Sequence, residues 1–236
     1  MTIHNRDPFL DRLANALGRP RKTQEVERPQ YSVQPQYEVL QNTTPDELVD
    51  VLEKQCEVIH TDFVKTTTAD LTTTLRSCLS IHEGQEIIVS RDKRNEIFGL
   101  NTFYEDLRKD LVDVHVWDKT IGKENQVIAE RADVGITFSD MTLAESGTVA
   151  LFNNADHGRS ISLLPQAYIA LIPKSTLVPR ITQVAQSLGE KVQREEQLPS
   201  CVSLVTGPSN SADIEMHLIV GVHGPVKATY ILIEDA

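Results

Sequence analysis

The chain has 236 residues, with 34 Asp and Glu against 23 Lys and Arg, which gives a formal net charge of −11 at pH 7. So acidic a chain lacks the clustered cations that bind nucleic acid or an anionic membrane surface, and we expect neither partner. No apolar run approaches the ~20 residues of a membrane span. The first 30 residues lack the features of a secretory signal, so we expect a cytoplasmic protein.

Residues 7–18 are predicted to form a short amphipathic helix, with Asp7 as N-cap and Pro8 at the first helical position. The arm that follows is rich in Pro and Gln and has no sustained period. We therefore predict a helix and extended arm over residues 1–43 and a compact domain over 44–236. The helix must pack on its own domain or on a second subunit, which leaves a homo-oligomer open. Its apolar stripe consists of Phe9, Leu10, Leu13 and Leu17.

Helical and β patterns alternate in the compact domain, which begins with a capping box at Thr44–Glu47. This alternation predicts βαβ units and a mainly parallel sheet, so the fold class is α/β. The predicted strands are 57–60, 86–90, 113–117, 133–138, 147–153, 168–173, 202–206 and 227–233. The predicted helices are 69–82, 101–109, 123–130 and 179–188, the last closed by Gly189, while 214–220 is a strand or a helix.

The three cysteines are Cys56, Cys78 and Cys201. Their odd number and wide separation do not suggest a disulfide framework, and they form no Cys-x-x-Cys pair or Cys/His cluster at metal-binding spacing. Phosphate-loop, dinucleotide-binding, zinc-protease and serine-hydrolase motifs are absent as well. We therefore expect this chain to carry neither a metal nor a redox cofactor.

Three glycine-punctuated segments border predicted strands: 140–148, 153–160, and the pair 207–215 with 221–225. Ligands of open α/β sheets bind outside the carboxyl ends of the strands, so we expect these loops to converge on a small carboxylate or phosphate. Plain turn chemistry is the alternative for each loop. The candidate catalytic residues are Glu145 and His223. The candidate ligand-binding residues are Ser146, Gly147, Thr148, His157, Gly158, Arg159, Gly207, Ser209, Ser211, Asp213 and Gly224.

Each residue type in these loops has a chemical reason to be considered. The glycines would let the backbone approach a ligand closely, and the hydroxyls would donate to it. Arg159 would clamp an anion bidentately, and a histidine would exchange protons near neutral pH. Without a ligand, we expect Glu145 or Asp213 to pair with Arg159 or a histidine, because two unpaired carboxylates would repel an anion.

Long runs of these loops resemble a known family. The runs GITFSDMTLAESGTVALF, HGRSISLLPQAYIALIP and VTGPSNSADIEMHLIVGVHGPVKATYILIED are similar to the LUD (lactate-utilisation) domain family. The opening helix, which ends in ALGRPR before the Pro/Gln arm, resembles one branch of that family. The resemblance covers essentially the full chain, up to Asp235.

The resemblance implies a NagB/RpiA/CoA-transferase-like fold, a three-layer α/β/α domain. It also implies a role in a three-protein system that oxidises L-lactate to pyruvate. Two sister proteins of that system carry iron–sulfur clusters and would be the partners. This chain would be an accessory subunit without a redox cofactor, in keeping with its lack of a four-thiolate set.

Two other classes of function stay open. Relatives of the fold include CoA-transferases, in which a glutamate forms a thioester, and Glu145 would be the candidate here. They also include sugar-phosphate isomerases, which use carboxylates beside an anion-binding loop. A regulatory protein with a vestigial pocket is the remaining alternative, since fold alone does not determine function.

Overall fold

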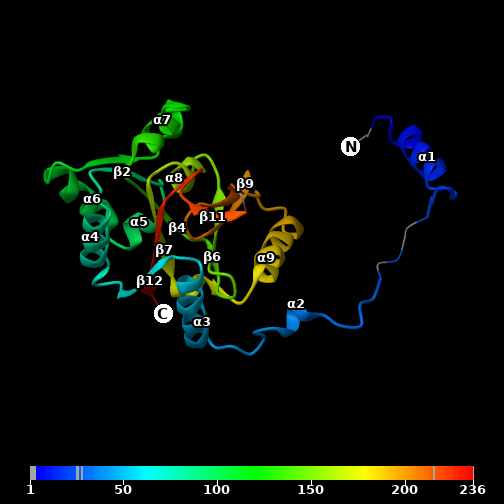
Figure 1. The fold of residues 1–236 in the computed structure, drawn as a ribbon, viewed down its shortest axis with the longest axis horizontal. Coiled ribbons are helices and arrows are strands. Elements are labelled where there is room, and N and C mark those ends of the chain that lie inside the picture. The colour runs from blue at the N-terminus through cyan, green and yellow to red at the C-terminus, as the bar shows by residue number, and fades with distance from the viewer. Residues whose placement is uncertain (1–3, 25–26, 28, 215, 236) are drawn as a thin grey trace. The chain divides into compact units, whose positions relative to one another are not determined.

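The computed structural model describes residues 4–24, 27, 29–214 and 216–235 (Figure 1). The chain divides into two compact units, of which the first ends at Pro35 and the second begins at Gln36. The first unit contains helix α1 (Arg6–Ala16), and the second contains the sheets. The domain boundary predicted between residues 43 and 44 stays a prediction.

Helix α1 begins slightly earlier than predicted. Asn5 occupies the N-cap position, so the prediction of Asp7 as N-cap is wrong. The Asp7 carboxylate lies in the first turn and binds the guanidinium of Arg21, which also donates to Asp11 over 3.1 Å. These ion pairs hold the segment after the helix against its polar side. The exposed residues of the predicted apolar stripe are Phe9, Leu13 and Leu17.

The predicted helices of the domain form in the predicted order as α3, α4, α6, α7 and α9, and α2, α5 and α8 are further short helices. Their bounds are α2 (Pro35–Glu38), α3 (Pro45–Val58), α4 (Leu71–Ile81), α5 (Arg94–Ile97), α6 (Leu100–Lys109), α7 (Glu124–Arg131), α8 (Ser160–Leu163) and α9 (Ile181–Gln193). The capping box of α3 is confirmed. Thr44 Oγ1 accepts the Glu47 N–H over 3.3 Å, and Glu47 Oε2 accepts the Thr44 N–H over 2.8 Å. This cap fixes where the α/β unit begins.

The main sheet has the strand order β1-β12-β7-β4-β2-β3, and all its pairs are parallel. Its strands are β1 (Asp62–Thr67), β2 (Glu86–Val89), β3 (Asp113–Val116), β4 (Val134–Phe138), β7 (Ala167–Pro173) and β12 (Lys227–Glu234). Strands β4 and β7 are buried along their whole length, as expected for parallel strands covered on both faces. The predicted mainly parallel sheet is therefore confirmed.

Helices cover both faces of this sheet (Figure 1). On one face, α4 and α6 bury leucines and aromatic rings against alternate residues of β2, β4, β7 and β12. On the other face, α3, α7 and α8 pack against the intervening residues of the same strands. The three-layer α/β/α architecture is confirmed.

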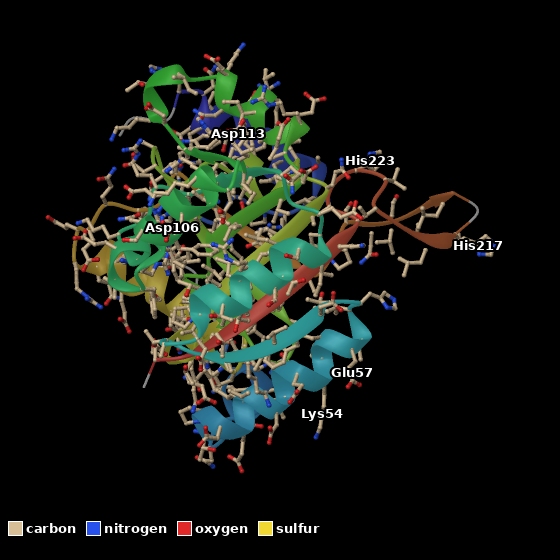
Figure 2. The ribbon with its side chains drawn as sticks, turned by 90° about the vertical axis from the view of Figure 1, so that its left-hand side faces the viewer. Lys54, Glu57, Asp106, Asp113, His217 and His223 are labelled. Atoms are coloured by element: carbon tan, nitrogen blue, oxygen red, sulfur yellow. The ribbon has the colours of Figure 1, made fainter. Side chains whose placement is uncertain are left out.

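A second sheet lies on the α3 side and has the order β8-β5-β6-β9. Its strands are β5 (Met141–Leu143), β6 (Thr148–Asn153), β8 (Leu177–Val178) and β9 (Cys201–Thr206). Leu143 and Ala150 face away from the main core and are covered by Val184 of α9. Strands β10 (Asn210–Ile214) and β11 (His217–Val220) form an antiparallel ribbon. Figure 2 shows this ribbon projecting from the body, with His217 far out along it and His223 near its base.

Three predicted elements need correction. The strand predicted over 57–60 is wrong, because α3 runs to Val58 and β1 begins only at Asp62. Gly189 does not end a helix but lies inside α9, where nothing crowds its α-carbon. Ile214 ends β10 and His217–Val220 form β11, so the helical alternative for 214–220 is wrong.

A buried histidine makes the stability of the domain sensitive to acid. His82 Nε2 lies 2.8 Å from Thr229 Oγ1, while Nδ1 has no partner among the described residues. Burial, and secondarily the positive charge of Lys227, lower the pKa of His82. The unfolded chain therefore takes up this proton at a higher pH than the folded chain does. The free energy of unfolding should fall as pH drops below about 6.5, by at most about 1.4 kcal/mol per pH unit from this group.

The measurement is urea denaturation of the wild type and His82→Gln at about pH 7.5 and about pH 5.5, on either side of the ordinary histidine pKa. The variant should lose less stability between the two pH values than the wild type does. An identical loss in both proteins would show that another group controls the acid sensitivity.

Candidate functional site

The predicted loop 144–148 and the start of loop 207–213 lie close together. Tyr230 Oη joins them, because it accepts the Gly207 N–H over 3.0 Å and donates to the Gly147 carbonyl over 3.0 Å. A row of hydroxyls runs alongside, with Thr148 Oγ1 2.7 Å from both Ser146 Oγ and Thr206 Oγ1. These contacts bring together two of the predicted segments.

A hollow of about 270 Å³ lies beside them, lined by residues that include Gly207, Ser209, His223 and Gly224. It lies at the amino ends of β7 and β12, because the Val226 N–H donates to the Gln166 carbonyl just before these strands begin. The expectation that these loops gather at carboxyl ends is therefore wrong. The chain passes through the β10–β11 ribbon on its way into β12, so the loops precede a strand of the main sheet.

The glycines of these loops face protein. An added Cβ would lie 2.6 Å from Ile59 Cδ1 at Gly147, 2.6 Å from the Ile59 carbonyl at Gly207, and 3.1 Å from the Leu163 carbonyl at Gly224. At Gly158 it would lie 2.0 Å from the Trp117 ring. These contacts leave no room for a side chain at the four positions, while Gly207 and Gly224 also line the hollow, so the close approach of their backbone to a ligand stays a prediction.

The expected charge pairing also differs. Glu145 is exposed, and its carboxylate accepts from Arg180 Nε over 2.6 Å instead of pairing with Arg159 or a histidine. Arg159 is exposed; its carbonyl accepts from Ser162, and its guanidinium forms no hydrogen bond or ion pair with a described residue. His223 is exposed, and Ser211 lies in β10 opposite Ile219. The side chain of Asp213 lies outside the part of the chain that the structure describes. The predicted ligand-binding and catalytic roles stay predictions.

A charged cluster that the sequence did not reveal lies at the carboxyl ends of β2 and β4. Asp92 follows β2, and Asp140 follows β4. Arg94 joins them, because its Nη2 donates to Asp92 Oδ2 over 2.6 Å and to Asp140 Oδ1 over 2.8 Å. Its Nη1 donates to the Ser139 carbonyl over 2.8 Å. After β2 the chain moves to one side of the sheet, and after β4 to the other, so the cluster occupies the topological switch point where α/β proteins bind ligands.

One predicted residue, His157, belongs to this cluster. Its Nε2 lies 3.4 Å from Asp92 Oδ2. The loop is held in place because Trp117 Nε1 donates to the Ala155 carbonyl over 3.0 Å while the Trp117 ring covers Gly158. The structure therefore places His157 and Gly158 at the opposite end of the sheet from the loops at Gly207 and His223, together with Asp140, the first residue of the predicted loop 140–148.

The cluster keeps its charges at neutral pH. Burial alone would raise the pKa of Asp92, but hydrogen bonds from Arg94 and its positive charge lower that pKa below the ordinary value. Burial would lower the pKa of Arg94, yet its carboxylate partners raise it. Asp140 Oδ2 also accepts the Phe152 N–H over 2.6 Å. The arrangement is a fixed carboxylate–guanidinium–carboxylate unit with a histidine at one end.

The space behind His157 is small. A cavity of about 10 Å³, lined in part by Ser90, Thr137, Asn153 and Gly158, lies between the strand ends and β6. That volume holds about one water molecule. Any larger ligand must therefore meet His157 from its solvent side, where 23% of the histidine side chain is exposed.

Comparison with known proteins decides the family. The LUD domain family model matches residues 49–233. The chain belongs to the LUD domain family. Among its relatives is "Lactate utilization protein C" of Oceanobacillus iheyensis, 62% identical over 99% of this chain and 100% of that protein. The protein of the same name from Bacillus subtilis is 48% identical over 99% of this chain and 98% of its own length. The branch that the N-terminal helix resembles is therefore confirmed.

A solved structure shares the fold of this LUD domain. The crystal structure of a DUF162 family protein from Deinococcus radiodurans matches with a TM-score of 0.56 and 17% identity. The match covers 81% of this chain and 99% of that one. At this identity the likeness supports the α/β fold and nothing finer.

In the described part of the LUD protein, no helix is long and apolar enough to cross a membrane. No three His, Cys, Asp or Glu side chains in the same residues are grouped so that they could hold a metal ion. The prediction that this chain carries no cofactor stays a prediction.

Replacing Tyr230 tests how the LUD domain holds the loops at Gly147 and Gly207 together. Tyr230→Phe should lower the free energy of unfolding by about 1–3 kcal/mol, because the buried Gly207 N–H loses its acceptor. The matched control is Tyr104→Phe, since the Tyr104 hydroxyl is buried without a partner among the described residues. That change should cost close to nothing. Equal losses in the two variants, measured by urea denaturation, would contradict the bridge.

Proposed function

We propose that this chain is an accessory subunit of an iron–sulfur lactate-utilisation system and is needed to oxidise L-lactate to pyruvate in the cytoplasm. The observation that carries the proposal is the end-to-end likeness to "Lactate utilization protein C" of Oceanobacillus iheyensis, at 62% identity. The match includes the N-terminal helix and arm as well as the LUD domain. A full-length match of this kind is stronger evidence for a shared role than a likeness of fold alone would be.

The proposal assigns the redox centres to the two sister iron–sulfur proteins. A cluster requires four ligands, usually thiolates, and this chain has three cysteines. Cys56 and Cys78 are buried. Burial raises the pKa of Cys56 to about 12, which keeps that group a thiol at neutral pH. These cysteines do not fit an iron–sulfur cluster, so the electrons from lactate would pass through the partners.

The test is reconstitution. The three proteins are purified without oxygen and combined, and lactate-dependent reduction of a dye is measured with and without this chain. We expect activity only with all three proteins, and we expect the isolated chain to be colourless and free of iron. Full activity of the two sister proteins alone would contradict the proposal, as would normal growth on L-lactate of a deletion strain with no other lactate dehydrogenase.

A further inference from the structure

We propose that His157, oriented by Asp92, accepts the hydroxyl proton of a small 2-hydroxy carboxylate at the carboxyl ends of β2 and β4, and that Arg159 binds the carboxylate of the same molecule. The inference rests on the proposed function, because it names the site at which this subunit would act on the substrate. It assigns the chemistry to the opposite end of the sheet from His223.

Asp92 is well placed to orient a base. Its side chain is only 6% exposed, and its Oδ2 lies 3.4 Å from His157 Nε2. Arg94 donates to Asp92 through Nε over 3.0 Å and through Nη2 over 2.6 Å. These two bonds prevent the Asp92 carboxylate from rotating away from His157. The carboxylate thus lies on the Nε2 side of the ring, which leaves Nδ1 as the atom that would accept the proton.

The charges of the cluster favour a proton over an anion. Asp92 and Asp140 contribute two negative charges and Arg94 one positive charge, so the cluster carries a net −1 when His157 is neutral. Taking up a proton at His157 brings that sum to zero beside a buried carboxylate. The same negative charge would repel a carboxylate placed among these groups. The cluster therefore suits the hydroxyl end of a hydroxy acid.

The carboxylate end needs a cation with free donors. Arg94 already donates to Asp92, Asp140 and the Ser139 carbonyl. Arg159 is exposed, its guanidinium has no hydrogen-bonding or ion-pair partner among the described residues, and it directly follows Gly158, which lines the small cavity. Its guanidinium can bind a carboxylate bidentately. A 2-hydroxy acid carries its hydroxyl and carboxylate on adjacent carbons, which matches a base and a cation on one short loop.

The proposed step balances. Oxidation of a 2-hydroxy acid to a 2-oxo acid breaks the O–H and C2–H bonds and forms the C=O double bond, releasing two protons and two electrons. The O–H proton goes to His157 Nδ1 and its electron pair forms the new bond. The C2–H bond gives up its two electrons one at a time to the iron–sulfur clusters that the proposed function assigns to the sister proteins, and its proton goes to solvent.

The experiment uses the reconstituted three-protein assembly with L-lactate. His157→Gln should lower kcat at least about 100-fold, since a positioned base contributes roughly that much or more. Asp92→Asn should lower kcat less and should leave KM for L-lactate unchanged, because Asp92 orients the base and does not touch the substrate. The matched control is His217→Gln on the exposed ribbon, which should leave kcat and KM unchanged.

The outcomes separate the two proposals. If omitting the whole chain leaves activity intact, the proposed function fails. If omission abolishes activity while His157→Gln behaves like His217→Gln, or Asp92→Asn leaves kcat unchanged, this inference alone fails. Should either cluster variant not assemble, the exposed Arg159→Gln keeps the inference testable. It should raise KM for L-lactate with kcat largely retained, and an unchanged KM would overturn the site.

Discussion

Replacing Arg94 with alanine is expected to destabilise the protein by about 3–5 kcal/mol. The reason is that Asp92 would stay charged in a buried position after losing its hydrogen bonds to Arg94 Nε and Nη2. Asp140 would lose the same partner. The free energy of unfolding from urea titrations at neutral pH measures the effect.

An exposed ion pair provides the matched control. Arg76 Nη1 lies 2.8 Å from Asp110 Oδ2, with both side chains about half exposed to solvent. Arg76→Ala should cost about 1 kcal/mol or less, because water screens such pairs. Adding Asp92→Asn to Arg94→Ala should recover part of the lost stability. Equal losses for Arg94→Ala and Arg76→Ala would show that the cluster contributes no more than a surface contact.

Adding a single methyl group at Gly135 is expected to destabilise the protein about as much as Arg94→Ala does. Gly135 lies in β4, and an added Cβ would sit 1.9 Å from the Ile161 carbonyl oxygen of α8. A backbone atom cannot move aside as a flexible side chain can, so α8 must shift from the sheet. We expect Gly135→Ala to cost about 3 kcal/mol, the upper end of the usual range for overpacking.

Gly189→Ala is the control for that substitution. Gly189 lies within α9 and has no heavy atom within 4 Å of the added Cβ. Alanine favours the helix there, so the change should stabilise the protein by up to about 1 kcal/mol. Thermal and urea unfolding of both variants should therefore shift in opposite directions. A neutral Gly135→Ala would contradict the close packing of α8 on β4.

The regular elements could be predicted wherever local pattern and tertiary structure agree. The run EIIVS became β2, and the capping box at Thr44 became the start of α3. The strand predicted over 57–60 failed because α3 continues to Val58, whose side chain is exposed, so its β-branched type indicated a strand that does not form. Strand β5 was missed because it is three residues long and exists through its pairing with β6 and β8.

The candidate site could be predicted only in part. Glycine-rich turns look alike whether they precede or follow a strand, so the loops at Gly207 and His223 were expected at the wrong end of the sheet. Asp92 and Arg94 lie in the segment SRDKR, which is typical of a solvated turn. They meet Asp140 because β2 and β4 are neighbours while β3 lies outside them, an order that the sequence does not display. Ligands of α/β sheets bind outside the carboxyl ends of the strands. Applying this rule to the strand EIIVS would have indicated Asp92 and Arg94, which follow it.

The pairing of β1 with β12 has a consequence for how the protein is made. Asp62 lies opposite Thr229, so β1 cannot pair until the ribosome has synthesised β12, more than 150 residues further along the chain. Until then, β1 and β7 both present unpaired parallel edges. Closing so long a stretch of chain is slow. A chain whose synthesis stops before Lys227 lacks β12, so its β1 has no partner and its β7 has an open edge. We expect such a chain to aggregate or to be degraded by proteases.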